Sequence, residues 1–285
     1  MTNGKHILLT GGGGFIGSHV HSRLVKLGYA VVAVSRSFSS DGRVGSLDLS
    51  RKSDVANFIE RTGPFDVIIH CAALAHGQRA PGGNTISDVN STMVANLVHA
   101  FGDRQPHWIF MSSVSVYGQP RDEVSNPIVV NPVALENYGQ GKLRDERLLM
   151  KACDTLDILR LAPTYDSQHM NDIKKRVFIP TTNIKIKISP SPYYTLCHVK
   201  TSGDKILECL RSGQGRNLHH VGDFKSISQH DLSNRFNGIS IIVPKFLFMI
   251  LNSILPSSLL GFSSLKIMLR KLGFNNVYEI DVKKL

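Results

Sequence analysis

The sequence predicts an α/β fold built on a doubly wound parallel sheet. Three observations support this prediction. Short apolar runs alternate with segments of helical periodicity, the first run leads into a glycine-rich turn, and the composition is that of an ordinary globular chain. Strands that are apolar along their whole length are typical of a parallel sheet covered by helices on both faces. With 42% hydrophobic and 19% charged residues in 285, disordered, collagen-like and coiled-coil classes are excluded.

The first half of the chain supplies the expected strands and helices. The apolar runs are 6–10, 30–35, 66–71, 108–112 and 157–161. Helical periodicity separates them at 15–27, 52–62, 84–102 and 134–152. Because ligands of such sheets bind beyond the carboxyl ends of the strands, functional residues are expected just after each run.

After residue 161 prolines interrupt the chain and the pattern changes. We expect a strand at 184–188 with Lys185 and Lys187 on its solvated face, then a helix at about 200–212. Residues 213–238 look rich in loops.

These segments predict two units, a sheet domain at 1–165 and a smaller lobe at 166–285, with part of 200–225 returning to the sheet. Within the lobe, Phe246 to Leu265 contains 20 residues without a charge. Serines, a proline and a glycine interrupt this stretch, so two short packed helices are expected rather than a membrane span.

A glycine-rich turn follows the first strand and opens a helix. It matches both G-x-x-G-x-x-G and G-x-G-x-x-G. Such glycines permit a tight turn and a close approach to a pyrophosphate, while the helix N-terminus supplies donors. A purely structural turn is the alternative, but the strand–turn–helix context favours a dinucleotide. The candidate contacts are Gly11, Gly14, Phe15, Ile16 and Gly17.

The end of the second strand indicates which dinucleotide binds. An acid for the adenosine 2′-hydroxyl of NAD is expected there, about 20 residues after the turn. The strand instead ends Ser35-Arg36-Ser37, without a carboxylate. Arg36 can pair with a 2′-phosphate, and an exposed loop arginine is the alternative. The balance favours NADP(H) over NAD(H).

Tyr138 and Lys142 form a candidate acid/base pair. Their spacing of four residues in a helical segment places both side chains on one face. A lysine ammonium and an oxidised nicotinamide nearby favour the phenolate, which makes Tyr138 a usable acid/base. Upstream, the serine-rich segment 111–118 ends a strand. A hydroxyl there can polarise a carbonyl, and a serine that satisfies its own backbone is the alternative.

In this order, the glycine turn, the serine-rich strand end and the Tyr-x-x-x-Lys pair resemble the extended short-chain dehydrogenase/reductase family. This is the NAD(P)-dependent group of nucleotide-sugar epimerases, dehydratases and reductases. Further matches are Ile69-His-Cys-Ala-Ala73, Asp88-Val-Asn90 and Ser112-Ser-x-x-Val-Tyr-Gly118. The resemblance covers residues 5–210 well, and it implies a Rossmann-type sheet with a mostly C-terminal substrate lobe.

The resemblance also implies the roles of single residues. Ser113 matches the catalytic hydroxyl, Tyr138 the acid/base and Lys142 the residue that holds the nicotinamide ribose. Further cofactor contacts are implied for Asp48 at the adenine and for Leu49, Ala72, Ala73 and Asn90. The implied substrate contacts are Ser113, Tyr138 and Asn171, the last at the diphosphate. 

Departures from the family pattern narrow the expected reaction. Val114 and Ser115 stand where sugar 4,6-dehydratases carry Asp-Glu, so dehydration is not expected. Galactose-type epimerases usually carry an acid where this chain has Ser35. Tyr194 stands where the family usually has a phosphate-binding arginine, so nearby cations such as Lys174–Arg176 would substitute.

The expected function is therefore NADP(H)-dependent reduction of the 4-keto group of a nucleoside-diphosphate (6-deoxy)sugar, in surface-glycan precursor synthesis. Two alternatives stay open. One is a nucleotide-sugar 4-epimerase with tightly bound NAD, and the other is a non-catalytic dinucleotide-sensing scaffold. The complete catalytic set argues against the scaffold.

The net charge of +11 comes from 33 Lys and Arg against 22 Asp and Glu. Phosphate-rich small ligands account for part of this excess. Nucleic acid is not expected, because no binding motif is present and aromatic residues are only 7%. Cations beside the apolar stretch leave open a weak peripheral membrane contact. The resemblance implies a homodimer paired through the helices that hold Asn90 and Tyr138.

The cysteines and histidines suggest no metal site. Cys71, Cys153, Cys197 and Cys209 are far apart, as is typical of reduced, buried thiols in a cytoplasmic protein. The adjacent pair His219-His220 has no carboxylate or thiol at ligand spacing. The first apolar run is too short for a signal peptide, so a cytoplasmic location is expected.

Overall fold

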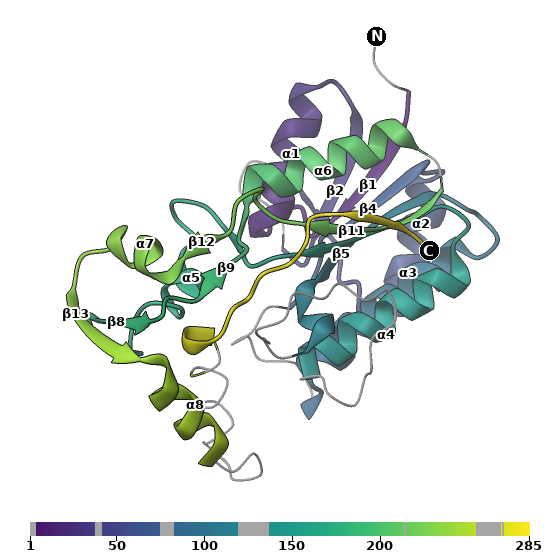
Figure 1. The fold of residues 1–285 in the computed structure, drawn as a ribbon. Helices are drawn as coiled ribbons and strands as arrows, with labels where there is room; N and C mark the ends of the chain where they lie inside the picture. Colours follow the sequence, from purple (N-terminus) through teal and green to yellow (C-terminus); the bar gives the residue numbers. More distant parts are fainter. Residues whose placement is uncertain are drawn as a thin grey trace.

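The main feature of the computed structural model is an eight-stranded sheet (Figure 1). The structure describes residues 4–37, 42–74, 83–118, 137–213, 215–254, 269 and 271–285. In spatial order the strands are β14 (Val282–Lys284), β11 (Arg216–Val221), β6 (Leu156–Leu161), β5 (His107–Ser113), β4 (Val67–His70), β1 (His6–Thr10), β2 (Ala30–Ser35) and β3 (Gly45–Ser46). All neighbours pair in parallel except β14, which runs antiparallel to β11. The strand order reverses between β1 and β4, where sheets of this kind form a ligand crevice.

Helices cover both faces of this sheet (Figure 1). One face carries α1 (Phe15–Lys26) and α6 (Val199–Ser212), and the other carries α2 (Lys52–Thr62), α3 (Ile86–Phe101) and α4 (Asn137–Ala152). Alternate strand residues therefore enter two different cores: Ile7 and Leu9 pack on the α1 side, and Leu8 packs on the α3 side. Burial on both faces explains the continuously apolar strands and confirms the expected doubly wound sheet.

The sequence predicted the elements of the first half closely. Each of the five expected strands is present within one residue of its expected bounds. The helices expected at 15–27, 52–62 and 84–102 correspond to α1, α2 and α3. The helix expected from residue 134 is α4, and residues 134–136 lie outside the described part of the chain.

Three small two-stranded sheets lie beyond the carboxyl ends of the main strands (Figure 1). Their strand pairs are β7 (Thr164–Tyr165) with β10 (Cys197–His198), β9 (Tyr193–Tyr194) with β12 (Ile227–Ser228), and β8 (Ile184–Ser189) with β13 (Ile239–Pro244). The helices of this smaller lobe are α5 (Asn171–Lys174), α7 (Gln229–Asn234) and α8 (Lys245–Ile254). A final segment returns from the lobe to the main sheet as β14.

One expectation for the second half is refined and one was wrong. Within 213–238, which looked rich in loops, β11 lies inside the main sheet, to which part of 200–225 was expected to return, and it pairs with β6 along its whole length. Lys185 is not solvated: its side chain is 7% exposed, and its Nζ donates to the carbonyl oxygen of Phe236 at 2.8 Å. The cause is α7, which packs against β8 and covers this side of the strand.

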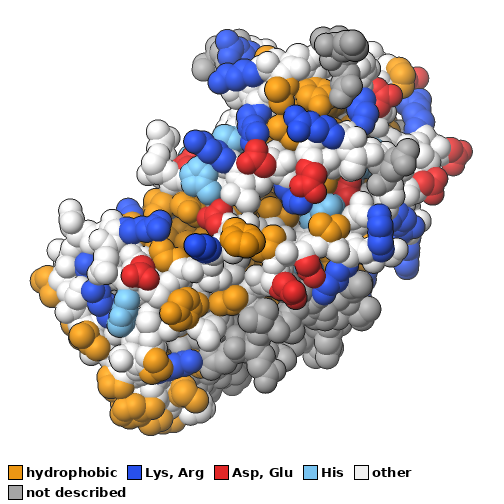
Figure 2. Space-filling view, turned by 45° about the horizontal axis from the view of Figure 1, so that its top comes forward, with side chains coloured by type: hydrophobic (Ala, Val, Ile, Leu, Met, Phe, Trp, Pro, Cys, Tyr) orange, Lys and Arg blue, Asp and Glu red, His pale blue; other side chains and the backbone are white. Residues whose placement is uncertain are grey.

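The apolar stretch at 246–265 is described only in part. Its first half belongs to α8, and residues 255–268 lie outside the described part of the chain. In the portion that the structure describes, no helix has the length and hydropathy to cross a membrane. Figure 2 shows hydrophobic side chains gathered on the surface at the end of the molecule that carries β13 and α8.

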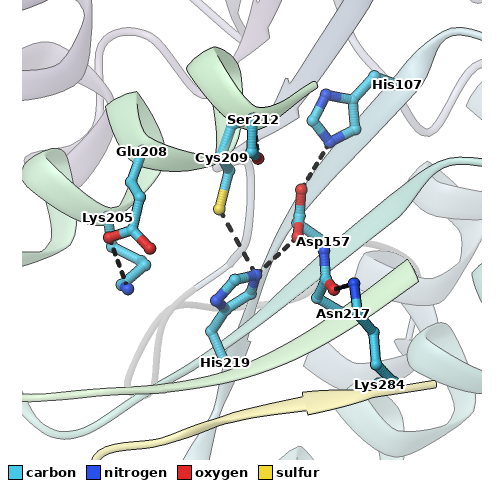
Figure 3. Close-up of polar contacts among 9 residues, drawn as sticks. All are labelled: His107, Asp157, Lys205, Glu208, Cys209, Ser212, Asn217, His219 and Lys284. Atoms are coloured by element: carbon cyan, nitrogen blue, oxygen red, sulfur yellow. Dashed lines mark hydrogen bonds and ion pairs between the residues drawn. The ribbon is translucent and has the colours of Figure 1, made fainter. Parts of the chain in front are cut away.

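A buried carboxylate, Asp157 at the start of β6, ties β5, β6 and β11 together (Figure 3). Its oxygens accept hydrogen bonds from His107 Nε2 at 2.7 Å, His219 Nε2 at 2.6 Å and Asn217 Nδ2 at 2.8 Å. Burial alone would raise the pKa of Asp157. The hydrogen bonds from these three donors outweigh that effect and hold the pKa well below its usual range.

We predict that Asp157→Asn lowers the free energy of unfolding by about 3 kcal/mol at neutral pH, because one histidine donor loses its acceptor inside the core. The stabilisation by Asp157 is present above the pKa of an unfolded aspartate, near 4, and is lost as the pH falls further. Urea unfolding at several pH values measures this.

Asp154→Asn makes the same chemical change at an exposed position nearby and should shift stability by less than about 0.5 kcal/mol. Equal effects of the two substitutions, or an Asp157 effect that does not shrink in acid, would contradict the assignment.

Candidate functional site

The glycine turn joins the carboxyl end of β1 to the start of α1. Gly11 has φ +72°, and a Cβ at this position would lie 2.6 Å from the backbone nitrogen of Ala72. A Cβ at Gly17 would collide with the carbonyl oxygen of Gly11. Gly14 caps α1 without a side-chain hydrogen bond, and the first turn of α1 carries no acid. This close, uncapped turn at a helix N-terminus fits a pyrophosphate.

The adenosine side of the turn carries no acid at the end of β2. Ser35 Oγ donates to the carbonyl oxygen of Ser37 at 2.5 Å and lies against the glycine turn, since a Cβ on Gly13 would be 3.2 Å away. The Arg36 side chain is exposed. It lies near enough to Asp48 to lower the pKa of that carboxyl, although the hydrogen bond from Ser50 is the larger cause. 

Of the other candidate cofactor contacts, Leu49 is buried in the sheet core. Ala73 lines the central cavity, and the backbone of Ala72 lies against Gly11. Asn90 of α3 fixes this segment: its Oδ1 accepts from Leu74 N at 2.7 Å, and its Nδ2 donates to Leu74 O at 3.2 Å. Asn90 therefore holds the residues after β4 in place rather than lining the cavity.

A cavity of about 320 Å³ opens at the carboxyl ends of β5 and β6. The structure brings five of the candidate residues together in its wall: Ile16, Ala73, Ser113, Tyr138 and Lys142. The last three come from the end of β5 and the first turns of α4. The residues proposed for proton transfer thus share one cavity with residues next to the glycine turn.

Lys142 is buried, and its Nζ donates to the carbonyl oxygen of Met111 at 2.8 Å. Burial lowers the pKa of Lys142, and the nearby carboxyls of Asp145 and Glu146 oppose that change. Burial also raises the pKa of Tyr138 to about 12, with a smaller contribution from Asp145. Without the oxidised nicotinamide that was expected to favour the phenolate, the phenol is protonated at neutral pH.

Ser113 ends β5 and begins a short 3-10 helix, Val114–Tyr117. Its Oγ accepts from Ser115 N at 3.1 Å and lies 3.0 Å from Ser115 Oγ. The serine therefore caps its own backbone, as the structural alternative supposed, and its residue also lines the cavity.

A buried ion pair connects α4, the helix that carries Tyr138 and Lys142, to β6 of the main sheet. Glu146 lies one turn after Lys142 on α4, and it accepts from Arg160 Nη2 at 2.7 Å and from Arg160 Nε at 3.0 Å. The hydroxyl of Ser112 donates to the same carboxylate at 2.5 Å. Arg160 Nη1 also donates to the hydroxyl of Tyr117 at 2.9 Å. The helix that carries Tyr138 is thereby fixed against the strand ends.

The wall of the cavity contributed by the lobe is cationic. Asp172 Oδ2 lies 2.8 Å from Arg176 Nη1, and its Oδ1 lies 3.3 Å from Lys271 Nζ. Burial alone would raise the pKa of Asp172, but the two cations hold it well below its usual range. Two cations on one carboxylate leave a net positive charge, which suits an anionic ligand. 

Sequence reasoning placed Asn171 at the substrate, but Asn171 is exposed and does not appear in the wall, where Asp172 and Arg176 lie. Arg176 was visible as part of the cationic run at 174–176. Lys271 and Tyr278 also line the cavity. They are far away in the sequence and gave no local signal.

No carboxylate or thiol lies at ligand spacing from His219 in the sequence, but the fold brings one of each to it. Asp157, Cys209 and His219 present one ligand atom each within 4.8 Å of one another, because β11 pairs with β6 and α6 packs over both (Figure 3). Sequence spacing could not reveal this. The four cysteines are free thiols, and Cys153, Cys197 and Cys209 are buried, as expected.

This trio fits a hydrogen-bonded network better than a metal site. The 2.6 Å contact from His219 Nε2 to Asp157 Oδ1 is a hydrogen bond, and Cys209 Sγ lies 3.6 Å from the same nitrogen. Histidine ligands usually donate their other ring nitrogen to an acceptor. His219 Nδ1 is buried and has no such partner within the described residues.

Solved structures share this fold. A UDP-Glc/GlcNAc 4-epimerase from Campylobacter jejuni superimposes with a TM-score of 0.68 at 19% identity, covering 85% of this chain and 87% of its own. A dTDP-4-dehydrorhamnose reductase from Bacillus anthracis, in complex with NADP, gives 0.61 at 17% identity, with 85% and 84% covered. At these identities the likeness establishes the fold.

Sequence relatives match a shorter region. A UDP-glucose 4-epimerase of Cyamopsis tetragonoloba is 31% identical over 163 residues, which are 50% of this chain and 46% of the relative. A probable UDP-arabinose 4-epimerase of Oryza sativa subsp. japonica is 27% identical over 173 residues, 51% and 40% respectively. The chain thus matches less than half the length of these curated relatives. A sequence model matches residues 7–181, more than half of the chain, and the chain therefore belongs to the NAD dependent epimerase/dehydratase family.

Proposed function

We propose that the chain reduces the 4-keto group of a nucleoside-diphosphate sugar, with NADP(H) as the hydride donor. One observation carries the proposal: a single cavity holds Ser113, Tyr138 and Lys142 on the sheet side and a cationic wall, Arg176 and Lys271, on the lobe side. The first set suits proton transfer to a carbonyl oxygen, and the second suits a diphosphate.

The glycine turn and the end of β2 support the choice of cofactor. The tight packing at Gly11 and Gly17 forms a turn that leaves the N-terminus of α1 without a side-chain cap, which suits a pyrophosphate. At the end of β2, Ser35 stands where an acid would bind a 2′-hydroxyl, and Arg36 follows it. When bound, the nicotinamide would supply the hydride. Lys142 would hold the ribose, and the hydrogen bond from its Nζ to the carbonyl oxygen of Met111 beside the strand end supports this role.

Tyr138 is the proposed proton donor. With its pKa raised to about 12, the phenol carries its proton at neutral pH, and a reductase needs that form to donate a proton to the forming alkoxide. Ser113 would donate a hydrogen bond from Oγ to the same oxygen. Its Oγ accepts from Ser115 N and donates to Ser115 Oγ, and rotation of the hydroxyl would exchange the second hydrogen bond for one to a bound carbonyl.

A 4-epimerase is the second candidate, and the named relatives favour it, since most of those cited above are UDP-sugar 4-epimerases. The two functions differ in cofactor use. A reductase consumes one NADPH for each product, whereas an epimerase returns the hydride and turns over with no cofactor added.

The deciding experiment follows NADPH absorbance with UDP-, dTDP- and GDP-linked 4-keto sugars, and separately follows interconversion of UDP-hexoses without added cofactor. We expect stoichiometric NADPH oxidation with a 4-keto sugar. Interconversion without added cofactor, and no NADPH oxidation, would replace the reductase with the epimerase.

Tyr138→Phe should lower kcat by at least about 100-fold, because the proton donor is lost while the ring stays in place. NADPH binding, measured by fluorescence titration, should be nearly unchanged. Tyr193→Phe removes a hydroxyl from an exposed tyrosine of the lobe and serves as the matched control. Turnover of the Tyr138 variant at the rate of this control would remove Tyr138 from catalysis.

Arg36→Ala should weaken NADPH binding about tenfold or more and leave NADH binding almost unchanged, because only NADPH carries the 2′-phosphate. Titration of both cofactors measures the difference. Arg61→Ala, at the exposed end of α2, removes the same charge away from the turn and should change neither value. Equal losses for both cofactors would exclude Arg36 from the phosphate site.

A further inference from the structure

The face formed by β13 and α8 (residues 239–254) exposes an unusual amount of apolar surface. Nine of its 16 residues are large hydrophobic side chains that are at least 40% exposed. Ile242 and Ile254 are exposed to 68% and 72%. Single exposed apolar residues are ordinary on protein surfaces, but a contiguous group of this kind marks a binding surface.

The helix α8 packs on the lobe through Phe248 and exposes an apolar stripe. Phe248 is 3% exposed and packs with Ile188 and Leu272. Phe246, Ile250 and Ile254 follow one another at spacings of four residues, so they form one stripe on the helix, and all three are exposed. The fold thus buries one aromatic ring of α8 and leaves its apolar stripe to a partner.

The segment that contains this face carries charges of one sign in the sequence. Between Leu232 and Tyr278 there is no Asp or Glu, and the cations are Arg235, Lys245, Lys266, Arg270 and Lys271, of which Lys271 lies in the cavity wall. The N-terminal residue of α8 is Lys245 itself. An apolar surface within an exclusively cationic segment is complementary to an anionic, apolar partner.

The partner that combines these two properties is an anionic lipid bilayer, and we propose that the β13–α8 face binds its surface. A helix of ten residues cannot span a bilayer. Lying in the interface, it can bury its apolar stripe at the headgroup boundary while cations contact anionic headgroups. A second copy of the same face would bring like charges together, which disfavours self-association there. The homodimer implied by the family resemblance would use α3 and α4 instead.

The test is co-sedimentation of the full chain with vesicles. We expect binding to vesicles of phosphatidylcholine mixed with phosphatidylglycerol, weaker binding to phosphatidylcholine alone, and a decrease as NaCl is raised, since salt screens the charge contribution. Absence of binding to the anionic vesicles would overturn the proposal, as would equal binding to both vesicle types.

The triple variant Phe246→Gln, Ile250→Gln, Ile254→Gln should lose binding roughly tenfold or more, because the apolar stripe is removed. The matched control is Val25→Gln, Leu27→Gln, which replaces exposed apolar side chains at the end of α1 and should bind as the wild type does. Thermal unfolding and NADPH binding verify that both variants are folded. Unchanged vesicle binding by the triple variant would exclude the face.

Light scattering separates a bilayer from a second copy. We expect the oligomeric state of the wild type and of the triple variant to be the same. If the wild type instead self-associates and the triple variant does not, the face is an interface between copies of this chain, and the membrane proposal fails. The outcome does not depend on the reaction proposed above, because no residue of the stripe lines the cavity.

Discussion

The buried ion pair between Glu146 and Arg160 is the interaction on which the candidate site depends. Glu146 belongs to the same helix as Tyr138 and Lys142, and Arg160 lies on β6 beside the strand that ends in Ser112 and Ser113. Breaking a buried pair costs about 3–5 kcal/mol, whereas a well-packed apolar pair often gives equal stability. The ion pair therefore matters more for positioning than for stability, because it fixes α4 against the end of β5. Ser112, which also donates to Glu146, is next to Ser113, the candidate catalytic serine.

The main sheet and the lobe contribute different kinds of residue to the wall of the cavity. The main sheet has apolar cores on both faces, and the ends of its strands carry the glycine turn and the candidate proton-transferring residues. The lobe supplies the cations Arg176 and Lys271, held by Asp172. Part of the excess positive charge of the sequence thus lies where phosphate groups would be bound. Arg235 and Lys245 belong instead to the segment of the sequence that contains the apolar face of the lobe.

Sequence patterns predicted the strands that carry apolar residues on both faces. They were less accurate for segments whose buried residues are polar. The apolar strands of the first half were visible because both of their faces meet helices. The bounds of β11 were not predicted, although part of 200–225 was expected to return to the sheet, because Asn217 and His219 interrupt its apolar pattern. Both side chains donate to Asp157, which is 60 and 62 residues away. Lys185 was misplaced for the same reason, since its acceptor comes from Phe236. The glycine turn and Tyr138–Lys142 have local spacing and were predictable, whereas Lys271 reaches the cavity only through the folded lobe.

The last segment of the chain connects one wall of the cavity to the edge of the main sheet. Tyr278 lines the cavity and stacks on Tyr117, and Asp281, which precedes β14, accepts a hydrogen bond from His220 Nδ1. Strand β14 is three residues long and pairs only at the edge of the sheet, where local opening has a low free-energy cost. Opening of this edge would loosen one wall of the cavity. A ligand that contacts Tyr278 would therefore stabilise the pairing of β14 with β11, and that pairing would in turn favour binding of the ligand.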